Sequence, residues 1–104
     1  MSRLLNDEEI TKELGNLPAW RRDGKTLVAS YDSPDFPAAV QLIVAAGDEA
    51  EKMSHHPDID LRWKVTTWRL STHSEGGLTQ LDIVLAHRIS AAATRLEAVS
   101  KEPQ

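Results

Sequence analysis

The sequence contains no cysteine, which excludes a disulfide framework, a thiolate metal site and a thiol nucleophile. It also lacks any apolar run that approaches the length of about 18 residues that a membrane-spanning helix requires. The opening stretch MSRLLNDEEI has no apolar core of the kind that signal peptides carry. The missing cysteines suit a reducing compartment. We therefore expect a soluble, cytoplasmic protein that has no membrane partner.

Positive charge is also scarce. Among the 104 residues, 12 are Lys or Arg and 16 are Asp or Glu, so that the net charge is −4. Proteins that bind nucleic acid carry a basic stripe or patch, whereas here the basic residues are scattered apart from the pair Arg21-Arg22. We expect no nucleic-acid partner. A hydrophobic content of 40% and a charged content of 27% are typical of a globular chain, and the length fits one domain over residues 1–104.

The first third of the chain predicts a helix followed by a hairpin. The segment 4–18 predicts a short helix, in which Asn6 can be the cap, Glu9 completes a capping box, and Gly15 lies just past the helix end. The dipeptide Asp23-Gly24 between two strand-like runs is typical of a type I′ turn.

The segment 35–53 is the strongest helix prediction, with Ser33 or Asp35 as its cap. Pro57 prevents its continuation, so the pair His55-His56 lies just beyond the helix end. The predicted buried face consists of Phe36, Val40, Ile43, Val44, Ala50 and Met53.

Residues 58–72 are rich in strand formers and predict either one long strand or a hairpin that turns near Arg62-Trp63. In the second half of this segment, Thr66, Trp68 and Leu70 share one face. A last helix begins at Thr79 as N-cap, with Asp82 completing a capping box. Its predicted buried stripe is Leu81, Leu85, Ile89, Ala92, Leu96 and Val99, followed by a frayed tail over 101–104.

This order of elements predicts an α+β fold with helices on one face of an antiparallel sheet. The edges of so small a sheet need water, charge or another subunit. We therefore expect a homo-oligomer.

Three of the four histidines gather around one helix exit and one strand end: His55, His56 and His73. With Glu51 or Asp82 they could be counted as metal ligands, but adjacent histidines diverge in direction and no zinc spacing such as HExxH is present. We expect no bound metal. Surface decoration is the plainest alternative.

Acid–base chemistry fits these residues better, because imidazole both donates and accepts protons near neutral pH. Two histidines from different segments could flank a flat substrate. Ser54, Ser71 and Thr72 lie nearby, but no nucleophile elbow accompanies them. His87, in the middle of the last helix, is interpreted as structural or solvent-facing.

With these residues in view, the chain resembles the pterin-4a-carbinolamine dehydratase family. That family's motif is an acidic or basic residue, three spacers, His-His-Pro, five spacers, an aromatic, nine spacers, His, eight spacers and Asp. In this sequence the positions are filled by Glu51, His55, His56, Pro57, Trp63, His73 and Asp82. Many members carry tyrosine at the aromatic position, so Trp63 lacks a phenolic hydroxyl.

The resemblance implies a four-stranded antiparallel sheet with three helices on one face, in the order α-β-β-α-β-β-α, which favours the hairpin for residues 58–72. It implies a dimer or tetramer that dehydrates 4a-hydroxytetrahydrobiopterin to quinonoid dihydropterin and water, without cofactor or metal.

The resemblance also implies residue roles. His55 and His73 would be the acid/base pair, and His56 would hold the pterin. Glu51 would orient the histidines, and Asp82 would position the last helix near the site. Pro57 and Trp63 complete the substrate-binding set. Two alternatives stay open: a protein-binding dimerisation cofactor, and an accessory role in another pterin pathway.

Overall fold

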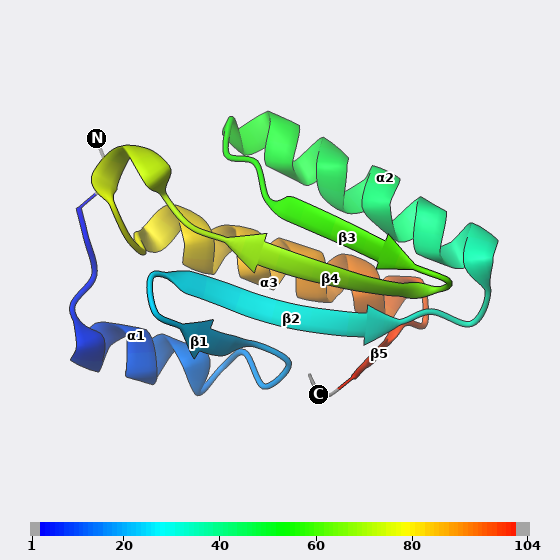
Figure 1. Cartoon of the computed structure of the whole chain (residues 1–104), viewed down its shortest axis with the longest axis horizontal. Coiled ribbons are helices and arrows are strands. Elements are labelled where there is room, and N and C mark those ends of the chain that lie inside the picture. The colour runs from blue at the N-terminus through cyan, green and yellow to red at the C-terminus, as the bar shows by residue number, and fades with distance from the viewer. Residues whose placement is uncertain (1–2, 102–104) are drawn as a thin grey trace.

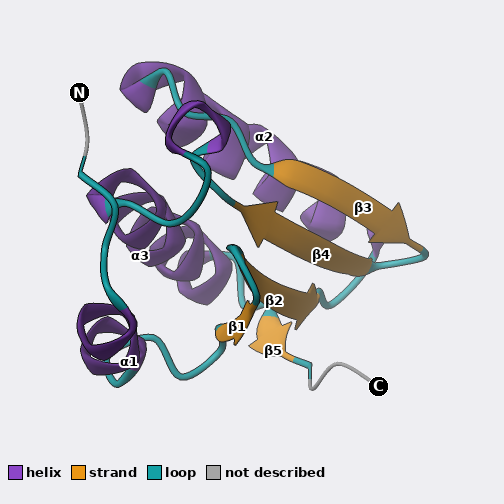
Figure 2. Cartoon of the chain, turned by 60° about the vertical axis from the view of Figure 1, so that its left-hand side comes forward, coloured by secondary structure: helices purple, strands orange, loops and turns teal. Residues whose placement is uncertain are grey.

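The computed structural model describes residues 3–101. Along the chain the elements are α1 (Asp7–Leu14), β1 (Arg21–Asp23), β2 (Thr26–Asp32), α2 (Phe36–Met53), β3 (Asp58–Arg62), β4 (Val65–Leu70), the short 3-10 helix η1 (His73–Glu75), α3 (Gln80–Arg95) and β5 (Val99–Ser100). The strands form one antiparallel sheet in the order β1-β2-β4-β3, with β5 also paired to β2. Figures 1 and 2 show α2 and α3 behind one face of this sheet. The predicted α+β fold is confirmed.

The segment 58–70 is a hairpin, as the family resemblance implied. Its two strands pair from Asp58↔Arg69 to Arg62↔Val65 around a turn at Trp63 and Lys64. The predicted alternation in β4 is also confirmed: Thr66, Trp68 and Leu70 are buried.

The four predicted strands are present, and the chain end adds a short fifth strand. Val99, predicted to lie in the last helix, is in β5 and exposed. The helix α3 ends at Arg95, and Glu97 then adopts a left-handed backbone with φ 63°. This reversal returns the chain to the part of β2 that the short β1 leaves open, where Val99 pairs with Asp32. The predicted frayed tail begins with Lys101, whose N–H donates to the Ser30 carbonyl; residues 102–104 lie outside the described range.

The caps of the helices follow the sequence closely. Asn6 and Glu9 form the predicted capping box of α1. Hydrogen bonds from the Arg3 guanidinium and the Asn6 backbone lower the pKa of Glu9 to about 2. The β1–β2 turn is displaced by one residue from the prediction: its central residues are Gly24 and Lys25, and only Gly24 has a positive φ, so it is not type I′.

The predicted buried face of α2 was largely wrong. The buried residues are Ala39, Leu42, Ala46 and Ala50. Phe36, Val40 and Val44 are exposed, whereas Ile43 and Met53 are half-buried. Small side chains allow α2 to pack closely on α3. The alanine-rich stripe is therefore buried in this contact, and the larger residues are not.

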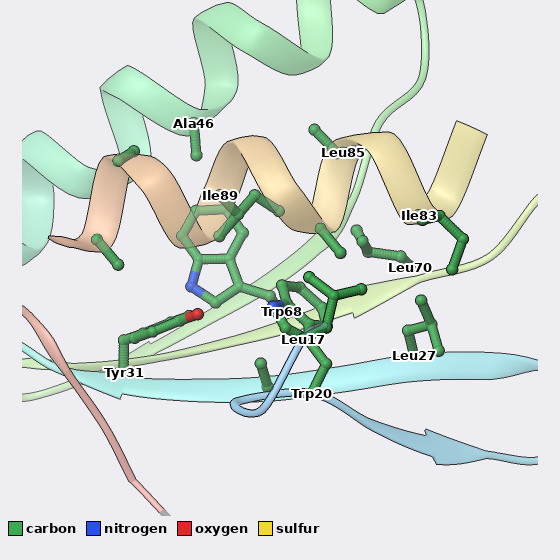
Figure 3. Packing of buried hydrophobic residues seen from close by; sticks show 14 of the residues in the cluster. Leu17, Trp20, Leu27, Tyr31, Ala46, Trp68, Leu70, Ile83, Leu85 and Ile89 are labelled. Carbon is green, nitrogen blue, oxygen red and sulfur yellow. The ribbon is translucent and has the colours of Figure 1, made fainter. Parts of the chain in front are cut away.

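The core lies between the sheet and α3 (Figure 3). Trp68 and Leu70 of β4 are fully buried, as are Leu85 and Ile89 of α3. One cluster includes residues from α1 to Ala98, which is in line with a single domain; the assignment of all residues 1–104 to it stays a prediction. Over residues 3–101, no helix is long and apolar enough to cross a membrane.

Candidate active site

The exit from α2 separates the two adjacent histidines. Ser54 follows the helix with a left-handed backbone, φ 52°, and the N–H of His55 donates to the Ala50 carbonyl at 3.1 Å. This reversal turns His55 inward, where it is 9% exposed, while His56 faces solvent. The two adjacent histidines thus point in different directions, as predicted.

His55 is held by a buried carboxylate. Its Nε2 lies 2.6 Å from Asp82 Oδ1, and Asp82 is fully buried in the first turn of α3. The other oxygen, Oδ2, accepts from the Thr72 hydroxyl at 2.7 Å and from the Thr79 N–H at 2.9 Å. A carboxylate that receives two such bonds is an acceptor, so His55 Nε2 carries the proton. This arrangement fixes the tautomer and leaves Nδ1 for other chemistry.

Thr72 and Thr79 complete the support of Asp82. Their hydroxyls lie 2.8 Å apart, and both residues are buried. Since Thr72 donates to Asp82, Thr79 donates to Thr72, and the polar groups form a directed chain that ends at His55. The sequence pattern indicates Thr79 only as a helix cap and Thr72 only as a hydroxyl near the histidines. The capping-box spacing identified the Thr79–Asp82 contact, but no local signal indicates the contact with His55.

His73 begins η1 directly after Thr72 and is exposed. Thr72 is fixed by its bond to Asp82 and by a bridge to Gly77. His73 is therefore one residue from the network that holds His55. Figure 1 shows the end of α2, η1 and the start of α3 at the same end of the molecule.

Glu51 contacts His56 and not His55. Its Oε2 lies 2.9 Å from His56 Nε2, and the two side chains are 79% and 63% exposed. A contact with this exposure is open to water and contributes little to stability. It can still restrict the orientation of the His56 ring.

Pro57 follows this pair, but Trp63 lies at the other end of β3. Trp63 is 71% exposed and stacks on Phe36 with ring centroids 6.3 Å apart. The strand β3 fills the extended chain between Pro57 and Trp63, which spans about 20 Å. Within one chain the structure therefore does not bring Trp63 to the histidines. In residues 3–101, no group of three or more His, Cys, Asp or Glu side chains is arranged to hold a metal ion.

Similarity to known proteins shows the family of this chain. The family profile described as "Pterin 4 alpha carbinolamine dehydratase" matches residues 3–92. The chain belongs to this family. The matched range includes every predicted site residue and excludes β5.

Relatives in this dehydratase family match most of this chain and nearly all of their own length. A Nocardia farcinica protein, described provisionally as a pterin-4-alpha-carbinolamine dehydratase, is 46% identical over 88% of this chain and 97% of its own. A Roseiflexus castenholzii protein with the same description is 46% identical over 86% of this chain and 96% of its own. A Brucella melitensis crystal structure, titled transcriptional coactivator/pterin dehydratase, superposes with a TM-score of 0.85 at 31% identity, covering 88% of this chain and 99% of that one.

Proposed function

We propose that this protein dehydrates 4a-hydroxytetrahydropterins, such as 4a-hydroxytetrahydrobiopterin, to quinonoid dihydropterin and water, and so supports tetrahydrobiopterin recycling. Membership of the family supports the reaction class. The single observation that supports a histidine mechanism is the 2.6 Å contact between His55 and the fully buried Asp82.

The reaction breaks the C4a–O bond and removes a ring N–H proton, and the hydroxyl leaves as water after it receives a proton. No electrons are transferred, so the chemistry requires no redox cofactor. One imidazole accepts the ring proton and another protonates the departing hydroxyl, and in our proposal these are His55 and His73. Groups in such roles contribute typically about 10²- to 10⁴-fold in rate.

Asp82 supports His55 in this scheme in two ways. It holds Nε2–H, which directs Nδ1 toward the substrate, and its negative charge stabilises the imidazolium that forms when Nδ1 accepts a proton. His56, oriented by Glu51, binds the pterin from the solvent side.

The test is the dehydration rate of chemically generated 4a-hydroxytetrahydropterin, followed by stopped-flow absorbance against the spontaneous rate. We expect His55→Ala and His73→Ala each to lower the rate by about 10²-fold or more, with unchanged circular dichroism. His87→Ala, an exposed histidine on α3, is the matched control and should keep full activity. Full activity in both site variants would remove the proposed roles, and no acceleration by the wild type would remove the activity itself.

A second candidate function is protein binding, because the Brucella melitensis structure carries the word coactivator in its title and this chain exposes apolar side chains on α2. Recovery of one stoichiometric protein partner, by the wild type and His55→Ala alike, would favour it. The homo-oligomer stays a prediction at this point.

A further inference from the structure

A pocket of about 250 Å³ lies where the loop after α1, the helix α3 and the chain end around β5 meet. The helix contributes a stripe of His87, Ser90 and Thr94 at helical spacing. We call it the Tyr31 pocket, because the buried Tyr31 points from β2 toward α3 and lies at its base (Figure 3). None of the predicted site residues lines it. Ser90 follows Asp82 by eight positions, about 12 Å along the helix axis, so the pocket is separate from the candidate active site.

The hydrogen bonds at the base of the pocket leave one hydroxyl proton unused. Ser90 Oγ accepts from Trp20 Nε1 at 2.9 Å and lies 2.8 Å from the Tyr31 hydroxyl. The two hydroxyls have two protons, and their mutual hydrogen bond uses one of them. Within residues 3–101 neither hydroxyl donates to another group. Because an unpaired donor away from water is costly, an acceptor that enters the pocket would be stabilised there.

The walls of the pocket favour an uncharged ligand. No Asp, Glu, Lys or Arg side chain lines it. A charged ligand would therefore lose water without meeting an opposite charge, which is unfavourable. The apolar part of the walls consists of Leu17, Pro18, Ala19 and Ala98. Pockets of this kind bury an apolar body, and a few polar groups orient it.

The volume limits the size of the ligand. A closed cavity of about 150 Å³ in another protein binds benzene, which has six non-hydrogen atoms. In proportion, about 250 Å³ accommodates about ten such atoms. Thr94 and His87 are exposed at the pocket, so a ligand can enter from solvent.

The wall formed by the chain end is fixed by hydrogen bonds. The N–H of Ala98 donates to the Ala93 carbonyl at 2.8 Å, and Ser100 pairs with Tyr31 between β5 and β2. Opposite residues of an antiparallel pair share a face, which explains why Ser100 lines the pocket beside Tyr31. The family profile ends at residue 92, so this wall lies outside the part of the chain that it matches.

We propose that the Tyr31 pocket is a second binding site, for an uncharged molecule of about ten non-hydrogen atoms that has one apolar side and one hydrogen-bond acceptor. The acceptor faces the hydroxyl pair of Tyr31 and Ser90, and the apolar side lies on the loop after α1 and on Ala98. This site goes beyond the dehydration reaction and does not depend on it.

Binding is tested with quinoline and indole, two uncharged bicyclic molecules of similar size. The ring nitrogen of quinoline accepts a hydrogen bond, whereas that of indole only donates one. Proton–nitrogen correlation spectra report on the pocket through the indole N–H of Trp20, which is bonded to Ser90. We expect quinoline to shift this signal saturably in the millimolar range, and indole to bind about 3- to 10-fold more weakly. The amide signals of His55 and His73 should not move.

The role of the hydroxyl proton is tested by Ser90→Asp. The new carboxylate can accept from both Trp20 and Tyr31, so that no donor remains for a ligand. Quinoline should then bind at least about 10-fold more weakly, and indole, whose N–H can donate to the carboxylate, should bind more tightly. A parallel change in the affinities of both probes would overturn the proposed acceptor.

The location is tested by filling the pocket from its exposed side. Thr94→Trp should abolish the shifts caused by quinoline, because Thr94 lines the pocket. Ala91→Trp is the matched control, since Ala91 is exposed on the same helix but does not line the pocket, and it should bind quinoline as the wild type does.

Three results would overturn the proposal. They are unchanged quinoline binding in Thr94→Trp, no saturable shift in the wild type up to the solubility of quinoline, and shifts centred on His55 and His73. Thr94→Trp should dehydrate 4a-hydroxytetrahydropterin at the wild-type rate. The binding experiment needs no activity, so failure of the dehydratase proposal is distinguishable from failure of this one.

Discussion

A single carboxylate, that of Asp82, serves both the fold and the site. Its Oδ2 accepts a hydrogen bond from the Thr79 N–H in the capping box of α3, and its Oδ1 binds His55. Because Asp82 is fully buried and its oxygens already have partners, it cannot turn toward a substrate. Its role in our proposal is to position His55.

Replacing this carboxylate by an amide should separate charge from shape. In Asp82→Asn the amide oxygen must keep accepting from Thr79 and Thr72, so the amide NH₂ faces His55 Nε2 and forces the opposite tautomer. We expect kcat to fall by about 10²-fold or more while the fold persists. Measured kinetics and the thermal midpoint check both parts.

Thr72→Ser is the control for that experiment, because it keeps the hydroxyl that donates to Asp82. It should retain activity near that of the wild type. Wild-type kcat in Asp82→Asn would show that the His55 tautomer does not matter.

At the scale of elements, α2 carries two apolar stripes, and the structure buries the one with smaller side chains. Ala39, Leu42, Ala46 and Ala50 are inside, while Phe36, Val40 and Val44 are exposed. Both stripes have helical period, so periodicity alone could not distinguish them.

The assignment of the buried stripe predicts a large difference between neighbouring positions. Leu42 is fully buried, so Leu42→Ala should lower the free energy of unfolding by about 2–5 kcal/mol. Gln41→Ala, one residue away and exposed, should change it by less than about 0.5 kcal/mol. Urea denaturation measures both, and equal effects would contradict the observed packing of α2.

At the scale of the whole molecule, one hydroxyl joins three parts of the chain. Ser90 Oγ on α3 accepts from Trp20 Nε1 at 2.9 Å and lies 2.8 Å from the Tyr31 hydroxyl on β2. Burial raises the pKa of Tyr31 above its usual value of 10.0, although the hydrogen bond to Ser90 opposes this shift.

This pKa shift predicts a loss of stability in alkali. A phenol with a raised folded pKa is favoured in its neutral form by the native state. Its contribution is therefore fully present below about pH 10 and lost as pH rises through the folded pKa. Above about pH 10, the free energy of unfolding should fall more steeply for the wild type than for Tyr31→Phe.

Urea denaturation across this range measures the difference. Tyr31 is the only tyrosine, so an ultraviolet titration assigns the folded pKa to it directly. Parallel pH profiles for the two proteins would show that Tyr31 ionisation is not coupled to folding.

The sequence alone determined the features that depend on residues close together in the chain. The caps at Asn6 and Thr79 and the alternation in β4 follow from local hydrogen bonds and side-chain period, and each is present in the structure. The sequence left Ser33 or Asp35 open as the cap of α2, and the structure has Asp35 there. The spacing of the histidine motif indicated the family for the same reason, because it is a local pattern.

Only the tertiary structure decided which surfaces meet. The contact of His55 with Asp82, 27 positions apart, and the return of Val99 to the edge of β2 depend on how distant elements pack. So does the exposure of Phe36, Val40 and Val44, which periodicity had placed inside. Packing depends on how the shapes of whole elements fit together, and this fit is not determined by residues that are neighbours in the chain.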